Sequence, residues 1–223
     1  MSRRGAEEGD PRKACGAAWD TLALMGPAQR DYVTVVSGLP RSGTSLVMQM
    51  LAAGGLPVLA DELRQPDAHN PRGYFEYSAV KRLREDASFL AAAVGRAVKV
   101  VVPLACALPA RLPGGEELGY RVVLVRRELC EVLASQDAML GGSNPGGLSG
   151  SRLAEICSTQ LEEFEAWAAG RRRLRLLCVE HAQLLREPRR AAAELSQLVG
   201  GGLDLETMAA AVDPALYHRR ARD

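Results

Sequence analysis

The sequence has 223 residues, of which 47% are hydrophobic and 25% are charged, and its formal net charge is +1. This length and composition predict a globular protein with a sizeable core, in which residues 31–223 form a single domain. A net charge so close to zero excludes a global field that would attract nucleic acid, so any anion site must be local.

The positions of cysteine and histidine indicate which redox environment and which metal sites to expect. The five cysteines and three histidines are scattered, and no CxxC pair occurs. This pattern argues against a zinc site or a disulfide framework, and it favours a reducing environment. The sequence contains no signal peptide and no run of 18 apolar residues, so we expect a cytoplasmic protein with no membrane partner. No metal is expected.

The chain begins with residues 1–30, which are charged and rich in glycine and alanine. This segment is expected to be partly disordered, with a short helix over residues 14–25. The first well-defined element is a strand over residues 33–36, which is a run of β-branched residues.

A small-residue loop follows this strand and leads into a helix from Thr44. In this layout, backbone N–H groups and a helix N-terminus can cradle a phosphate. Gly38 and Gly43 fit the G-x-x-x-x-G spacing of the P-loop, but Thr44 stands where an ATPase has lysine. The loop instead carries a cation between its two glycines, at Arg41. This position favours an anion other than the β- and γ-phosphates that the lysine of an ATPase holds. A degenerate P-loop or an ordinary strand–turn–helix is the alternative.

Helices and strands alternate along the rest of the chain. The expected elements are a short strand over 56–60, a polar loop over 61–76, a helix over 78–94, strands over 97–103 and 120–126, a helix entered after Arg127, a loop over 141–151, a helix over 152–169, a strand over 174–179, a helix from Pro188 and a last short helix capped by Asp204. The strand over 120–126 is apolar on both faces, which is typical of a central strand. The alternation predicts a three-layer α/β/α fold with a central parallel sheet, like that of P-loop NTPases.

The loop sequence closely resembles the 5′-phosphosulfate loop of sulfotransferases. Tyrosylprotein sulfotransferases carry arginine at the position of Arg41, and cytosolic members carry lysine. The resemblance covers most of residues 32–188. It implies transfer of a sulfuryl group from the cosubstrate 3′-phosphoadenylyl sulfate to a hydroxyl or amine, with Arg41 as the cation for the leaving and bridging oxygens. The loop residues that it implies for cosubstrate binding are Pro40, Arg41, Ser42, Gly43, Thr44 and Ser45.

A second part of the resemblance concerns the 3′-phosphate of the cosubstrate. The family places an arginine at a strand end and a serine eight residues later, and Arg127 and Ser135 have this spacing. Eight residues are just over two helical turns, so both side chains are expected to face one crevice. Ligands of open α/β sheets lie at this end of the strands. The family's basic C-terminal segment is absent, and Arg219 or Arg220 is either its substitute or part of a frayed tail.

Lys99 lies in another passage that resembles the family. Lys99, Pro103 and Leu104 match it, and this implies a catalytic role for Lys99. The alternative is an edge or snorkelling lysine. The family's general base, a histidine, is replaced by Val101.

Because attack by a hydroxyl requires a proton acceptor, another residue must act as the base. We expect none of the three histidines, His69, His181 and His218, at a strand end beside the loop. A carboxylate is then the remaining choice. Tyrosylprotein sulfotransferases use a glutamate 21 residues after the loop arginine, and the same count from Arg41 reaches Glu62. Asp61 and Glu76 are the alternatives.

Two other classes of function stay open. A P-loop nucleotide or small-molecule kinase would need the missing lysine. A catalytically inactive nucleotide-binding protein would explain Val101 and the missing basic segment. The acceptor is a small molecule, a glycan or a peptide, and the sequence does not distinguish these or indicate an oligomeric state.

Overall fold

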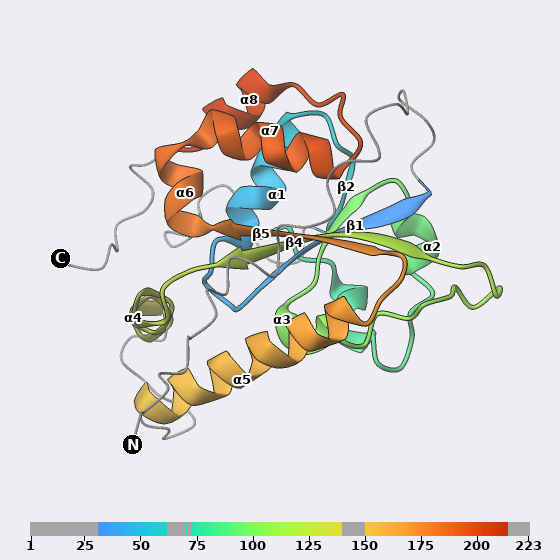
Figure 1. Cartoon of the computed structure of the whole chain (residues 1–223), viewed down its shortest axis with the longest axis horizontal. Helices are drawn as coiled ribbons and strands as arrows, with labels where there is room; N and C mark the ends of the chain where they lie inside the picture. The colour runs from blue at the N-terminus through green and yellow to red at the C-terminus, as the bar shows by residue number, and fades with distance from the viewer. Residues whose placement is uncertain (1–30, 62–69, 71–72, 140–149, 214–223) are drawn as a thin grey trace, which may run out of the picture.

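A computed structural model describes residues 31–61, 70, 73–139 and 150–213 (Figure 1). The expected helix over 14–25, most of the loop over 141–151 and the basic C-terminal tail lie outside these residues. The strands are β1 (Tyr32–Gly38), β2 (Val58–Leu59), β3 (Ala97–Lys99), β4 (Gly119–Arg126) and β5 (Leu174–Glu180). The helices are α1 (Thr44–Ala53), η2 (Ser78–Arg82), α2 (Leu90–Ala93), α3 (Val102–Ala105), α4 (Leu129–Met139), α5 (Gly150–Ala169), α6 (His181–Arg186), α7 (Pro188–Leu198) and α8 (Leu205–Ala210). None of these helices combines the length and apolar character that crossing a bilayer requires.

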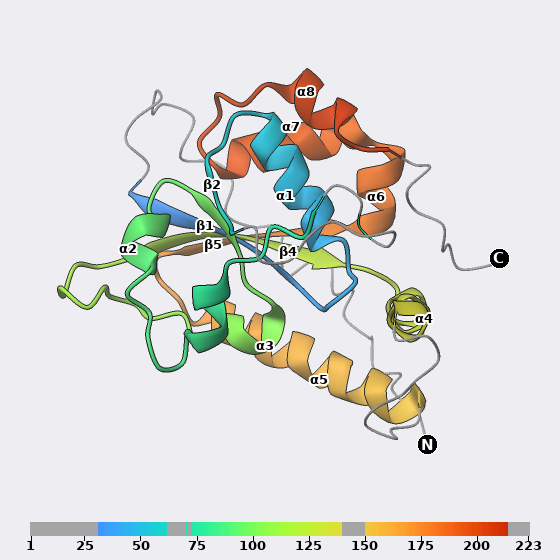
Figure 2. The same ribbon diagram turned by 180° about the vertical axis from the view of Figure 1, so that it is seen from behind.

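The five strands form one sheet in the order β2-β3-β1-β4-β5, and every pairing is parallel. Helices α1, α6, α7 and α8 cover one face, and α3 and α5 cover the other (Figures 1 and 2). The predicted three-layer α/β/α fold is therefore confirmed. The strand over 120–126 is β4, which lies inside the sheet between β1 and β5.

Strand alternation divides the interior into two cores. In β1, Val33 and Val35 point into the core beneath α3 and α5, whereas Val36 points into the core beneath α1 and α7. In β4, Val122 and Val123 likewise point to opposite cores. Since successive side chains of a strand face opposite sides, a sheet covered on both faces needs apolar residues at nearly every position. This requirement explains the apolar runs in the sequence.

The predicted helix over 78–94 is wrong, because two short helices take its place. The 3₁₀ helix η2 ends at Arg82, and α2 begins only at Leu90. Between them, Asp86 Oδ1 accepts a hydrogen bond of 2.9 Å from the Ser88 backbone N–H. Aspartate side chains compete in this way with helical hydrogen bonding.

The predicted strand over 97–103 is too long. β3 ends at Lys99, and the chain turns into α3 with Pro103 in its first turn. Proline is tolerated in a first helical turn but has no N–H to donate to a sheet. The predicted strand over 56–60 also shortens, to the two residues of β2.

Two further features concern the C-terminal part of the fold. Asp204 caps α8 as predicted, since its carboxylate accepts from the N–H groups of Glu206 and Thr207 at 3.0 and 3.1 Å. Helix α6 was not predicted. It begins directly after β5 and ends before Pro188, which starts α7.

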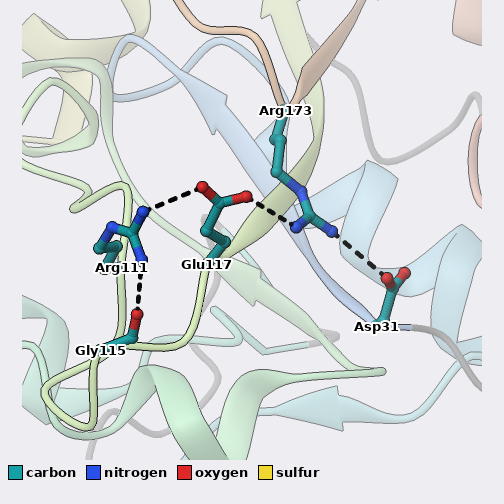
Figure 3. A network of polar contacts seen from close by, with 5 residues as sticks. All are labelled: Asp31, Arg111, Gly115, Glu117 and Arg173. Atoms are coloured by element: carbon teal, nitrogen blue, oxygen red, sulfur yellow. Dashed lines mark hydrogen bonds and ion pairs between the residues drawn. The ribbon is translucent and has the colours of Figure 1, made fainter.

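A surface network of ion pairs ties together the N-terminal ends of three strands (Figure 3). Glu117 precedes β4, and its carboxylate pairs with Arg111 at 3.1 Å and with Arg173 at 3.2 Å. Arg173 precedes β5 and also pairs at 3.4 Å with Asp31, which precedes β1. These side chains are largely exposed, so the network contributes little free energy of unfolding. It lies at the edge of the sheet opposite to the loop after β1.

Candidate functional site

The loop after β1 closes tightly around Gly38. Ser42 donates its backbone N–H to the Leu39 carbonyl at 3.1 Å. A Cβ at Gly38 would lie 2.4 Å from Ser42 Oγ and 2.7 Å from the Val125 carbonyl oxygen on β4. Contacts this short do not occur with a real side chain, so glycine is needed for the loop to approach β4.

Two loop residues have left-handed backbone. The φ angles of Arg41 and Gly43 are 72° and 104°. This region suits glycine but is sparsely populated by arginine, and such outliers gather at functional sites. Gly43 caps α1 without a side-chain hydrogen bond. Since the first N–H groups of a helix have no partner within it, this end of α1 is suited to an anion.

The structure brings the two predicted phosphate-binding segments together. The Arg41 guanidinium donates through Nε to Ser135 Oγ on α4 at 3.1 Å. Arg127 donates through Nη1 to the Arg41 carbonyl at 3.1 Å. Arg127 also pairs with Glu131 at 2.8 Å, and both side chains are largely buried. Arg127 and Ser135 therefore both contact Arg41 of the loop.

Lys99 approaches the same loop from β3. Its side chain is only 9% exposed, and its ammonium lies 3.9 Å from the Glu76 carboxylate. Lys99 also donates to the Tyr74 carbonyl, which accepts a second hydrogen bond of 3.4 Å from Ser45 Oγ on the first turn of α1. Because β2 pairs with β3, Lys99 is on an interior strand, and its contacts hold it in the site rather than in water.

The segment that carries Glu76 is held in an unusual backbone conformation. Phe75 has a φ angle of 51°. Among the described residues, Arg41 and Phe75 are the two non-glycine residues with positive φ, and both lie in this site. The Phe75 side chain packs against the core that includes α1, while its neighbours Tyr74 and Glu76 contact Lys99.

The other two candidate carboxylates have different surroundings. Asp61 accepts a 2.6 Å hydrogen bond from the Ser78 backbone N–H, at the start of η2. Its carboxylate therefore has a structural role. Glu62 lies outside the described residues. The Asp61 N–H donates to the Glu76 carbonyl at 2.8 Å, so the two segments run side by side.

An open hollow of about 320 Å³ lies next to Arg127, between the start of α4, helix α5 and the end of β5. Its charged lining consists of Arg126, Arg127, Glu128, Glu162, Glu165 and Glu180. Carboxylates outnumber guanidiniums here, and Arg126 is paired with Glu165. The hollow is thus poorly suited to phosphate. Within the described ranges, no three His, Cys, Asp or Glu side chains gather as a metal ion would require.

Comparison with solved structures identifies the architecture. The sulfotransferase domain from the Synechococcus PCC 7002 olefin synthase is similar, with a TM-score of 0.51 and 15% sequence identity over 86% of this chain and 89% of that chain. The chain has the sulfotransferase fold. The sulfotransferase domain from the curacin biosynthetic pathway matches with a TM-score of 0.47 and 14% identity, over 85% of this chain and 90% of that one. No protein-family model and no curated protein sequence matches.

Ser42, which was expected to donate to the 5′-phosphate, is enclosed within the loop. Its N–H is used by Leu39, its side chain is only 1% exposed, and its hydroxyl is enclosed against Gly38. Ser42 therefore shapes the loop. Gly43, Thr44 and Ser45 lie at the start of α1, where the first backbone N–H groups have no partner within the helix.

His181 was missed by the sequence analysis, and the expectation that no histidine lies at a strand end beside the loop is wrong. β5 extends to Glu180, one residue beyond the prediction, and α6 begins at once. This turn brings the His181 ring, which is 3% exposed, against Gly43. The available signal was the position directly after a buried parallel strand.

Burial lowers the pKa of His181 from 6.5 to about 4, the positive charge of Arg127 adds to this effect, and Glu131 opposes it. The imidazole is therefore neutral at pH 7. With so low a pKa, and enclosed behind the loop, it is a poor general base for an acceptor.

The low pKa of His181 predicts an acid-sensitive fold. The unfolded chain binds a proton at His181 at a higher pH than the folded chain does. This contribution to the free energy of unfolding is present above pH 6.5 and is lost progressively as the pH falls toward 4. The pKa difference corresponds to about 3 kcal/mol at most. Urea unfolding of the wild type and His181→Gln, at about pH 7 and about pH 4.5, measures it. His181→Gln should lose less stability on acidification, and an equal loss in both proteins would contradict the assignment.

Proposed function

We propose that the protein is a sulfotransferase that moves a sulfuryl group from 3′-phosphoadenylyl sulfate to a hydroxyl or amine acceptor. The observation that carries this proposal is the hydrogen-bonded connection of Arg41 with Ser135 and of Arg127 with the Arg41 backbone, in a chain with the sulfotransferase fold. Two segments about 90 residues apart are thus in contact, and together they would bind an anion. The acceptor is a small molecule, a glycan or a peptide.

The residues fit a nucleotide with phosphates at both ends of its ribose. The N–H groups of Gly43, Thr44 and Ser45 would hold the 5′-phosphate, with the positive end of α1 behind them. Arg127 and Ser135 would hold the 3′-phosphate. Arg127 is only 9% exposed, and a guanidinium in this setting binds phosphate through charge-assisted hydrogen bonds. No metal is part of the proposal.

Transfer would proceed by in-line displacement at sulfur. The acceptor oxygen or nitrogen forms a bond to sulfur while the bond from sulfur to the phosphate oxygen breaks, leaving 3′,5′-adenosine bisphosphate. Negative charge grows on the departing phosphate oxygen, so catalysis depends mainly on positioning and electrostatics. Arg41 is the cation that would stabilise this charge.

Glu76 is the proposed general base. Its carboxylate lies beside Lys99, and the Tyr74 carbonyl links Lys99 with Ser45 at the start of α1. Glu76 would accept the proton of the acceptor hydroxyl, and Lys99 would orient Glu76 and neutralise part of the charge. Asp61 is less suited because its carboxylate caps η2. Glu62 stays a candidate on its spacing from Arg41 alone.

Two other functions are less well supported. A nucleotide or small-molecule kinase would need a cation after Gly43, where the chain has Thr44. An inactive nucleotide-binding protein would share the crevice but would need no proton acceptor beside Lys99. The experiments below separate these possibilities.

The proposed cosubstrate predicts which adenine nucleotides the protein binds. A thermal shift panel would compare 3′,5′-adenosine bisphosphate with AMP, ADP and ATP. The bisphosphate alone should stabilise the protein strongly, by about 2.7 kcal/mol at 100 times its dissociation constant. Equal or greater stabilisation by ATP would contradict the proposal and favour a kinase.

The same nucleotides test Arg127 directly. Arg127→Ala should weaken binding of the bisphosphate about tenfold or more, because a charge-assisted hydrogen bond is worth about 1.5–3 kcal/mol. The affinity for AMP should stay nearly unchanged. Arg126→Ala is the matched control, since Arg126 is the neighbouring arginine and pairs with Glu165 rather than with the Arg41 backbone. If Arg127→Ala weakened both nucleotides equally, its assignment to the 3′-phosphate would be wrong.

Glu76→Gln keeps the shape of the side chain and removes the base. It should lower turnover by about 10²-fold or more, with the cosubstrate dissociation constant nearly unchanged. Turnover would be followed as radiolabelled sulfuryl transfer to an acceptor identified from phenols, sugars and peptides. Asp61→Asn is the control, because an amide oxygen can still accept from the Ser78 N–H. An active Glu76→Gln together with an inactive Glu62→Gln would move the role of base to Glu62.

A further inference from the structure

The His181 ring contacts the phosphate loop at a point that the proposed chemistry does not use. A Cβ built on Gly43 would lie 2.5 Å from His181 Cδ2 and 3.3 Å from Nε2. The Cδ2–Nε2 edge of the imidazole therefore occupies the space beside Gly43 that a side chain would otherwise fill. His181 belongs to α6, which lies about 140 residues beyond the loop in the sequence.

The loop needs support of this kind because of its backbone. Arg41 keeps its sparsely populated positive φ only because its surroundings enforce it, whereas Gly43 adopts positive φ readily and, as a flexible glycine, needs contacts to fix its position. Arg127 holds one of these residues by donating to the Arg41 carbonyl. The ring of His181 contacts the other. Gly43 is also the residue whose carbonyl accepts from Leu46 and Val47 at 3.0 and 3.3 Å, so its position sets the start of α1.

We propose that His181 is a positioning residue, whose ring holds the turn at Gly43 in the shape that binds the 5′-phosphate. This inference rests on the proposed function for the identity of the ligand. The groups around His181 are consistent with it. Arg127 lies near one side with its partner Glu131, and burial keeps the imidazole uncharged at neutral pH. The ring thus acts by contact, and it adds no charge to the crevice.

The chain offers a set of variants that separates positioning from general stability. His181→Ala removes the contact. Glutamine can place its amide as far from the backbone as the imidazole Nε2, whereas asparagine reaches only as far as Nδ1 and Cδ2 and so keeps part of the contact with Gly43. Leu184→Val, one turn further along α6, trims a fully buried side chain that does not belong to the loop.

Titration of 3′,5′-adenosine bisphosphate into these folded proteins tests the inference. His181→Ala should weaken binding about tenfold, since a misplaced loop loses its preorganisation, and His181→Asn should weaken it less. His181→Gln should recover most of the affinity. Leu184→Val should lower the midpoint of thermal unfolding and leave the affinity unchanged.

Hydrogen exchange of the nucleotide-free proteins gives a readout that does not depend on the ligand. Backbone amides of residues 39–45 should exchange faster in His181→Ala than in the wild type or Leu184→Val. Unchanged exchange and affinity in His181→Ala would overturn the inference. Losses of affinity that are proportional to the loss of thermal stability in all variants would also overturn it. A wild type that fails to bind the bisphosphate would contradict the proposed function instead, and the exchange data would then decide the role of His181.

Discussion

The close approach of β1 to β4 at Gly38 positions the residues of the candidate site. Gly38 pairs in register with Val125, and the carbonyl oxygen of Val125 lies only 2.7 Å from where a Cβ of Gly38 would be. Because the two strands end side by side, the loop after β1 and Arg127 after β4 emerge at one edge of the sheet. The hydrogen bonds among Arg41, Arg127 and Ser135 follow from this pairing.

Several residues of the candidate site have backbone conformations or surroundings that are unfavourable in free energy. Arg41 and Phe75 have left-handed backbone, and Lys99 and Arg127 are charged side chains with little exposure. Each is retained through specific partners: Arg127 has Glu131, and Lys99 has Glu76 and a carbonyl oxygen. A buried charge without a partner would be strongly destabilising. Strain and buried charge gathered at one edge of the sheet are typical of a site selected for function rather than for stability.

The sequence predicted the parts of this molecule that depend on local patterns. Apolar runs marked the strands, and the spacing of Gly38 with Gly43 and of Arg127 with Ser135 marked two segments that contact each other in the structure. Contacts between distant segments were not predictable in the same way. The turn of His181 onto Gly43 depends on where β5 ends, and the capping role of Asp61 depends on where η2 begins. The sequence placed both boundaries to within one residue, but the contacts that His181 and Asp61 make with distant segments have no signal in the local sequence.

A crystal structure of the protein with 3′,5′-adenosine bisphosphate tests the central claim most directly. The claim is that one nucleotide spans the start of α1 and the Arg127–Ser135 pair. The account predicts the 5′-phosphate within hydrogen-bonding distance of the Gly43, Thr44 and Ser45 N–H groups, and the 3′-phosphate on the Arg127 guanidinium and the Ser135 hydroxyl. A nucleotide bound elsewhere, or with its 3′-phosphate away from Arg127, would contradict it.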